Sequence, residues 1–225
     1  MHHPLDRPVW NALTTWHAAF AQGGARARCY PPEIVPLCAT LDGSSESFLE
    51  LHALIPKGGF LALATPEPIA APDGFVVVMT ATFDQMVATT VAPAASPHIH
   101  VLGDVDAPEM LALGQPLLPT SFFARSHELG RHVGVRAERR LVAIAGERLR
   151  LTGFTEISSV CTDPDHRGRG YARALVAHLG RAILDRGEVP FLHVHSTNRA
   201  AISVYLRLGF VFRRVMHLTA LQVAE

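Results

Sequence analysis

Apolar and polar residues alternate most clearly in the second half of the chain. Residues 132–149 form two alternating segments around a polar turn at 137–140, and this pattern predicts two paired strands. A third alternating segment, residues 154–162, predicts a strand whose even-numbered side chains share one face, among them Glu156 and Val160. Three consecutive strands are therefore expected in this region.

Helical spacing follows the third strand. Apolar residues recur every three or four positions from Ala172 to Ile183, which predicts a helix that ends near Gly187. Residues 190–196 predict the next strand, and residues 198–208 predict a second helix.

The closing segment, residues 210–221, predicts one or two strands. A shorter helix is expected over 105–117, with Asp106 as its cap and Pro108 in its first turn. The resulting order of strands and helices predicts an α/β fold with a mixed sheet.

The first hundred residues carry a weaker pattern. Residues 10–22 have helical spacing, and the segments 58–64, 74–82 and 95–103 resemble strands bounded by Gly or Pro. We therefore expect an N-terminal α/β half over residues 1–105, of unknown role, and a second domain over residues 106–225.

Composition narrows the function classes. The 225-residue chain is 48% hydrophobic with a formal net charge of +0, so a globular fold is expected and nothing favours nucleic acid as a partner. The sequence has no apolar run that could span a membrane and no secretory signal, so a cytoplasmic location is expected. Three cysteines without CxxC spacing favour neither a disulfide framework nor a zinc site.

Two histidine pairs, at 98 and 100 and at 193 and 195, alternate with an apolar residue. On a strand each pair would point to one face, as metal ligands do, but histidines that line a cleft give the same pattern. We expect a cleft and no metal.

The loop before the first long helix reads CTDPDHRGRGYA, residues 161–172. Its glycines permit positive φ and leave the backbone accessible, and its arginines add positive charge where the helix begins. Such a segment can hold a pyrophosphate, although a tight, soluble turn has the same composition. The spacing matches neither a P-loop nor a dinucleotide fingerprint.

This loop and a second element together resemble a known family. Arg167, Gly170 and Ala172 match the [QR]-x-x-G-x-[GA] signature of the GNAT superfamily of acyl-CoA-dependent N-acyltransferases. Residues 198–210, NRAAISVYLRLGF, resemble that family's N-x-x-A-x-x-x-Y-x-x-x-G-F element. The resemblance covers about 130–215, looks closest to the glycine N-acyltransferase-like branch, and implies a mostly antiparallel mixed sheet flanked by helices. By analogy, the resemblance implies that the N-terminal half is a degenerate second copy of that fold.

The resemblance implies acetyl-CoA as co-substrate. Its pantetheine arm would lie between the strands at 154–162 and 190–195, paired with backbone groups of one of them, and its pyrophosphate would lie on the N–H groups of 167–172. Arg173 or Arg207 would reach the adenosine phosphate. The implied coenzyme-binding residues are Val160, Cys161, Thr162, Arg167, Gly168, Arg169, Gly170, Tyr171, Ala172, Asn198 and Ala201.

Transfer to an amine needs a base and an acid. Glu156 is the candidate base, with a pKa that burial would raise, although a surface or ion-paired glutamate is the alternative. Tyr205 is the candidate acid that protonates the departing sulfur, although a core aromatic residue has the same spacing. Asn198 either binds pantetheine or only caps its helix.

Further residues are candidates for the acceptor site. His193 and His195 flank the expected cleft, and one of them could assist deprotonation. Phe122, Phe123 and His127 precede the first clear strand and could wall the acceptor site. Cys161 is expected to point away from Glu156 and to pack under a helix rather than act as a nucleophile.

The function expected is transfer of an acetyl group, or another short acyl group, from coenzyme A to a primary amine in a ternary complex. The acceptor could be an amino acid, a peptide or a small amine, and the protein could be a homodimer. One alternative is a non-catalytic module that senses acyl-CoA. A nucleotide-binding protein is a third interpretation, but the chain lacks the lysine and the ribose-binding context.

Overall fold

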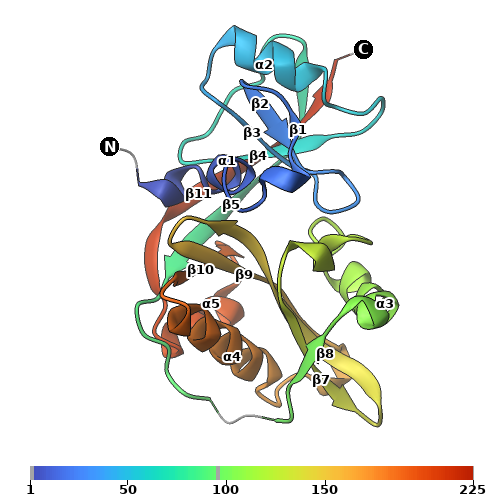
Figure 1. Cartoon of the computed structure of the whole chain (residues 1–225), viewed down its shortest axis with the longest axis vertical. Coiled ribbons are helices and arrows are strands. Elements are labelled where there is room, and N and C mark those ends of the chain that lie inside the picture. Colours follow the sequence, from blue (N-terminus) through green and yellow to red (C-terminus); the bar gives the residue numbers. More distant parts are fainter. Residues whose placement is uncertain (1–2, 95–96, 225) are drawn as a thin grey trace.

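The computed structural model describes residues 3–94 and 97–224, and in them the strands form a single sheet (Figure 1). The order across the sheet is β1-β2-β3-β4-β11-β5-β10-β9-β8-β7-β6. The strands are β1 Gln22–Gly23, β2 Ala27–Cys29, β3 Leu37–Thr40, β4 Leu61–Thr65, β5 Phe75–Val87, β6 His100–Leu102, β7 His132–Ala137, β8 Arg140–Leu151, β9 Phe154–Thr162, β10 Val189–His195 and β11 Val211–Val223.

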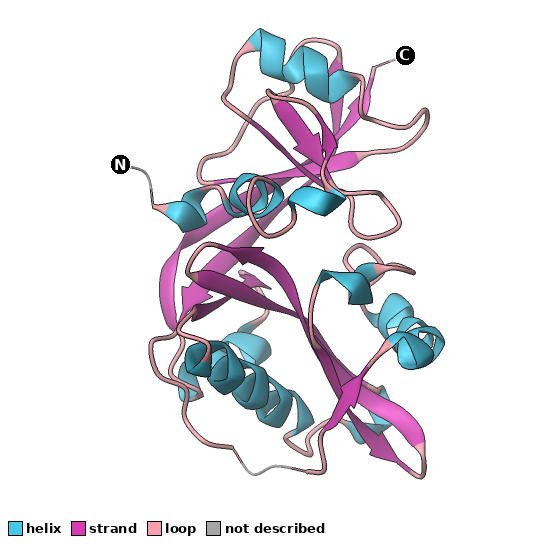
Figure 2. Ribbon diagram, in the orientation of Figure 1, coloured by secondary structure: helices cyan, strands magenta, loops and turns pink. Residues whose placement is uncertain are grey.

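Helices cover both faces of this sheet (Figure 2). The α-helices are α1 Pro8–Leu13, α2 Ser45–His52, α3 Ala107–Leu117, α4 Tyr171–Asp185 and α5 Arg199–Arg207. The α4 side chains share a core with one face of β7–β10, while α3 covers the opposite face near Ile144 and Cys161. No helix in the described part of the chain is long and apolar enough to cross a membrane.

The elements expected after residue 130 are confirmed. β7 and β8 meet at a tight turn where Glu138 and Arg139 both have positive φ, 51° and 69°. The helices α4 and α5 end before Gly187 and Gly209, whose φ values of 77° and 97° favour glycine. β9 has the expected bounds.

The N-terminal part differs more from expectation. The helical spacing over 10–22 gives only α1 and the 3₁₀ turn Ala18–Phe20, and β1, β2, β3 and α2 were not expected. β5 is longer than its pattern suggested and lies between β10 and β11. The sheet is therefore continuous across residue 105, and the division of the chain there stays a prediction.

A β-bulge in β9 corrects the expected alternation. Ile144 and Gly146 of β8 lie opposite Cys161 and Ser158, so β9 carries one extra residue, and Ser159 there has φ of 56°. Cys161 therefore returns to the face of β9 that carries Glu156, and it packs with Ile144 under α3. The prediction that Cys161 points away from Glu156 is wrong because the bulge resets the alternation.

β9 and β10 separate along their length, as expected. They pair in parallel only where Val189–Phe191 lie against Phe154–Glu156. Within residues 3–94 and 97–224, the remainder of β9 has no strand partner on that side, so its backbone groups face a gap.

Candidate active site

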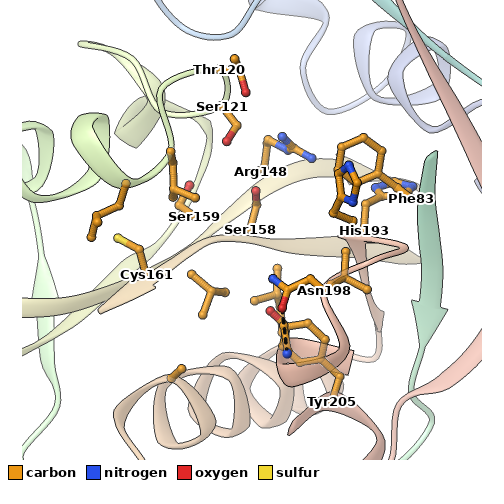
Figure 3. A pocket seen from close by; sticks show the side chains of 18 of the residues that line it. Phe83, Thr120, Ser121, Arg148, Ser158, Ser159, Cys161, His193, Asn198 and Tyr205 are labelled. Carbon is orange, nitrogen blue, oxygen red and sulfur yellow. Dashed lines mark hydrogen bonds between the residues drawn. The ribbon is translucent and has the colours of Figure 1, made fainter. Parts of the chain in front are cut away.

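A cavity of about 970 Å³ opens from this gap (Figure 3). It is bounded by the second half of β9, the start of α4 and the first turns of α5, and it continues over β4, β5 and β11. Eleven of the expected coenzyme residues line it, namely Val160, Cys161, Thr162, Arg167, Gly168, Arg169, Gly170, Tyr171, Ala172, Asn198 and Ala201. Tyr205, His193 and His195 line it as well.

The start of α4 leaves backbone donors open. Gly168 and Gly170 have φ of 76° and 78°, and a Cβ built on either glycine meets no protein atom within 4 Å. The amide N–H groups of 168–170 donate to no described residue, and the first turn of α4 adds its own unpaired N–H groups. Open space thus faces a row of donors at the positive end of a helix.

Four arginines that line the cavity lack a carboxylate partner in the described part of the chain. They are Arg167, Arg169, Arg173 and Arg207. Three of them bond to a backbone carbonyl at 3.3–3.5 Å, and Arg207 bonds to the Ser203 hydroxyl. The Nε of Arg173 is buried without a partner. Unpaired guanidinium groups around open amides suit a ligand with several phosphates, so the residues present fit coenzyme A.

Tyr205 lies on the cavity-facing side of α5 and is only 8% exposed. Burial raises the pKa of its phenol to about 12, so the hydroxyl is protonated at neutral pH. The hydroxyl has no hydrogen-bond partner among the described residues. Asn198 caps the same helix, because its side-chain oxygen accepts the Ala201 N–H at 3.1 Å (Figure 3).

Glu156 lies beneath the cavity rather than in its lining. Its exposed fraction is 0%, and the Arg148 guanidinium donates to both carboxylate oxygens, at 2.8 and 2.7 Å. Burial favours the neutral acid, but Arg148, together with a hydrogen bond from His193, outweighs it and lowers the pKa of Glu156 to about 2. The expectation of a raised pKa is therefore wrong.

His193 connects this ion pair to the cavity wall. Its Nδ1 lies 2.7 Å from Glu156 Oε1, and its Nε2 lies 3.0 Å from the Nε2 of Gln85. Gln85 has a fixed orientation, because it donates to the Leu5 carbonyl and its oxygen accepts from Arg213. The amide nitrogen of Gln85 therefore donates to His193 Nε2, and His193 donates through Nδ1 to Glu156.

The remaining predicted residues fall into two groups. His195 lines the cavity and its Nδ1 lies 2.8 Å from the Thr197 hydroxyl. Phe122, Phe123 and His127 do not line the cavity; Phe122 is buried against His132 under α3. Residues that precede Phe122 in the sequence form this part of the wall instead, namely Leu117, Leu118, Thr120 and Ser121.

Cys161 lines the cavity but remains a thiol, because burial raises its pKa to about 12. This value agrees with the expectation that it is not a nucleophile. Among the described residues, no group of three or more metal-ligating side chains is arranged to hold a metal ion.

Sequence reasoning missed Arg148 and Gln85. Each is a polar residue inside an extended strand that also carries other charged residues, Arg150 in β8 and Asp84 in β5. Alternation did not distinguish Arg148 and Gln85 from these half-buried charged neighbours. The available signal in β5 was Gln85 directly before the apolar pair Met86 and Val87 at the end of a largely apolar strand.

Comparison with known proteins gives a consistent result. Residues 132–217 match the family model described as FR47-like protein. The chain is 32% identical over 118 residues to the [ribosomal protein bS18]-alanine N-acetyltransferase of Salmonella typhimurium, covering 50% of this chain and 79% of that protein. It is 39% identical over 84 residues to the N-alpha-acetyltransferase RimI of Mycobacterium tuberculosis, covering 35% of this chain and 51% of that protein.

Solved structures extend the likeness to the whole chain. A crystal structure assigned to the GNAT-family acetyltransferases, from Novosphingobium aromaticivorans, is 36% identical with a TM-score of 0.92 and covers 100% of both chains. A GCN5-related N-acetyltransferase from Kribbella flavida shares the fold at 16% identity, with a TM-score of 0.67 over 96% of this chain and 95% of that one.

Proposed function

Because this chain belongs to the GNAT superfamily and is an acetyltransferase, we propose that it transfers an acetyl group from acetyl-CoA to a primary amine by direct attack in a ternary complex. One observation carries the proposal. Unpaired arginines and open amides surround the gap between β9 and β10, and the free Tyr205 hydroxyl faces the same cavity.

Coenzyme binding follows from the two ends of this gap. The N–H groups of 168–172 and the four unpaired arginines hold the phosphates, and Asn198 has an amide group left to contact the pantetheine arm after capping α5. The unpaired edge of β9 offers backbone groups of Val160 and Thr162 to the pantetheine amides. These contacts fix the thioester beside α5.

Acetyl transfer from the thioester to the amine then needs one proton donor from the protein, for the departing sulfur. The neutral amine nitrogen bonds to the thioester carbon, the carbon–sulfur bond breaks, and one proton moves from nitrogen to sulfur. Tyr205 gives its proton to the sulfur, and the proton released by nitrogen restores the phenol through water. The positive charge of the surrounding arginines disfavours an ammonium and therefore favours the reactive, neutral amine.

For Glu156 we propose a positioning role in place of the direct base expected from the sequence. Its carboxylate is completely buried, ion-paired and a weak base, so it supports the reaction by holding Arg148 and His193 in the cavity wall. His193 forms that wall with both ring nitrogens engaged.

Release of free thiol from acetyl-CoA with a panel of amines tests the function. Gly170→Ala places a methyl group in the open space before α4 and should abolish coenzyme binding, measured by calorimetry. Gly153→Ala is the matched control, because Gly153 has φ of 80° in the open β8–β9 turn, outside the cavity lining. Tight coenzyme binding without turnover of any amine would favour the acyl-CoA-sensing module.

A further inference from the structure

The charges that line the cavity are all of one sign. Of the described residues in its wall, five are arginines and four are histidines, and none carries a carboxylate. Carboxylates close to this wall already have cationic partners: Glu156 pairs with Arg148, Asp6 with Arg213, and Asp163 with Arg140 and His166. Asp84 accepts a hydrogen bond from the Ser196 hydroxyl. The cavity therefore offers no anionic partner to a second ammonium group on the acceptor.

The part of the cavity away from the coenzyme motif has an apolar floor. Ala64 on β4, Leu218 on β11 and Ala81 on β5 are opposite one another in register, as are Met216 and Phe83. Side chains two residues apart on a strand share a face, so one face of these three strands is apolar. The residues of this face that line the cavity are Ala62, Ala64, Met79, Phe83, Met216 and Leu218, and we call them the acceptor floor.

The acceptor floor leads directly to the reactive end of the cavity. Phe83 and Gln85 share a face of β5, and Gln85 contacts His193. The Phe83 ring also packs edge-on against His195, with ring centroids 5.5 Å apart. Val35 and Leu37 from the N-terminal part line the same space. The first hundred residues thus contribute an apolar wall beside the reacting groups.

We propose that the acceptor is a primary amine with an apolar body and no second positive charge, and that the N-terminal part of the chain provides the wall that selects it. This inference rests on the proposed function. An apolar body is stabilised by burial against the acceptor floor, whereas a diamine would place an ammonium there without a partner. Polyamines and aminoglycosides are excluded on the same ground.

A matched pair of amines tests the proposal. 1-Hexylamine and 1,5-diaminopentane have nearly the same length and differ in a terminal methyl group against a terminal ammonium. We expect kcat/KM for hexylamine to exceed that for the diamine by at least about 100-fold, because burying an unpaired charge costs more than a methyl group gains. Equal or better use of the diamine, or of spermidine, would overturn the proposal, as would turnover with only an alanine-starting peptide.

A variant pair assigns the effect to the acceptor floor. Leu218 is half-buried and flanked by Ala64 and Ala81, so a longer polar side chain has room there. Leu218→Glu supplies the missing carboxylate, and Leu218→Gln is the uncharged control of the same shape. The Glu variant should use diaminopentane at least about tenfold better than the Gln variant. No difference between them would mean that the floor does not contact the acceptor.

Failure of the proposed function remains distinguishable from failure of this inference. If no amine releases thiol although acetyl-CoA binds, the proposed function fails. The inference is then decided by binding with coenzyme A present: 1-hexanol should raise the melting temperature and diaminopentane should not. A shift by the diamine, or none by hexanol, would overturn it.

Discussion

The two ends of the cavity are built in opposite ways. The proposed coenzyme end comes mostly from one continuous segment, 160–173, whose glycines and arginines act through local backbone geometry, with Asn198, Ala201 and Arg207 added from α5. The acceptor end comes from β4, β5, β8 and β11 together with α1, which are far apart in the sequence. The coenzyme end can therefore be recognised in the sequence as a motif, whereas the residues of the acceptor end come together only when the sheet forms.

The largest expected effect is on stability, and it tests the acceptor end, whose residues come from distant parts of the sequence. Glu156→Leu leaves the Arg148 guanidinium without its carboxylate and should reduce the free energy of unfolding by about 3 kcal/mol, measured by denaturant titration. The double variant Glu156→Leu/Arg148→Met removes both charges and should recover most of the loss. If the single variant is as stable as the double, the pair does not hold the acceptor end together.

The next largest effect is on the reaction rate, and it concerns Tyr205, which lies between the coenzyme end and the acceptor end. Tyr205→Phe removes the hydroxyl but keeps the ring that packs on Phe210, so it should lower kcat by about 100-fold and leave the Kd for coenzyme A unchanged. Single-turnover kinetics with saturating acetyl-CoA measure this. An unchanged rate would show that the thiolate leaves without an acid.

The pH dependence of stability gives a second test of the Glu156–Arg148 ion pair beneath the acceptor end. The folded-state pKa of Glu156, about 2, lies below its ordinary value, so its contribution is present above about pH 4.5 and is lost as the pH falls towards 2. Between pH 5 and pH 3 we expect this group alone to remove about 2 kcal/mol of stability. The double variant Glu156→Leu/Arg148→Met should have a flatter profile over this range. Parallel profiles would place the acid sensitivity elsewhere.

The smallest effect concerns one phosphate contact. Arg173→Met should weaken coenzyme A binding about tenfold and leave the amine preference unchanged, because Arg173 is beside the local motif and remote from the acceptor floor. Calorimetry with coenzyme A and with its 3′-dephospho form would show which phosphate it meets. Arg181, which lies on α4 outside this cavity, provides the control variant Arg181→Met.

The sequence predicted most of the features that depend on residues close together in the chain. The bounds of β9, the cap at Asn198 and the open turn at Gly170 follow from nearest-neighbour spacing and glycine conformation. The bulge at Ser159 did not follow, because Val160 and Cys161 after it are both apolar and both faces of β9 are covered, so the sequence does not show which of the two side chains lies on which face.

The electrostatics of the site were harder to predict than its backbone. The charge state of Glu156 depends on Arg148 from the adjacent strand and on His193 from β10, and neither pairing is visible in a linear pattern. The wall at 117–121 was displaced by a few residues for a related reason, because Phe122 is large and apolar enough to be used in the core under α3.

The position of β11 has a consequence for how the enzyme is made. This strand is the last element of the chain, yet it occupies the middle of the sheet between β4 and β5. The acceptor floor takes Met216 and Leu218 from β11, so it is incomplete until residues 211–223 have been synthesised. A polypeptide that stops before residue 211 would therefore keep the segment 160–173 but lack part of the surface that we propose selects the amine.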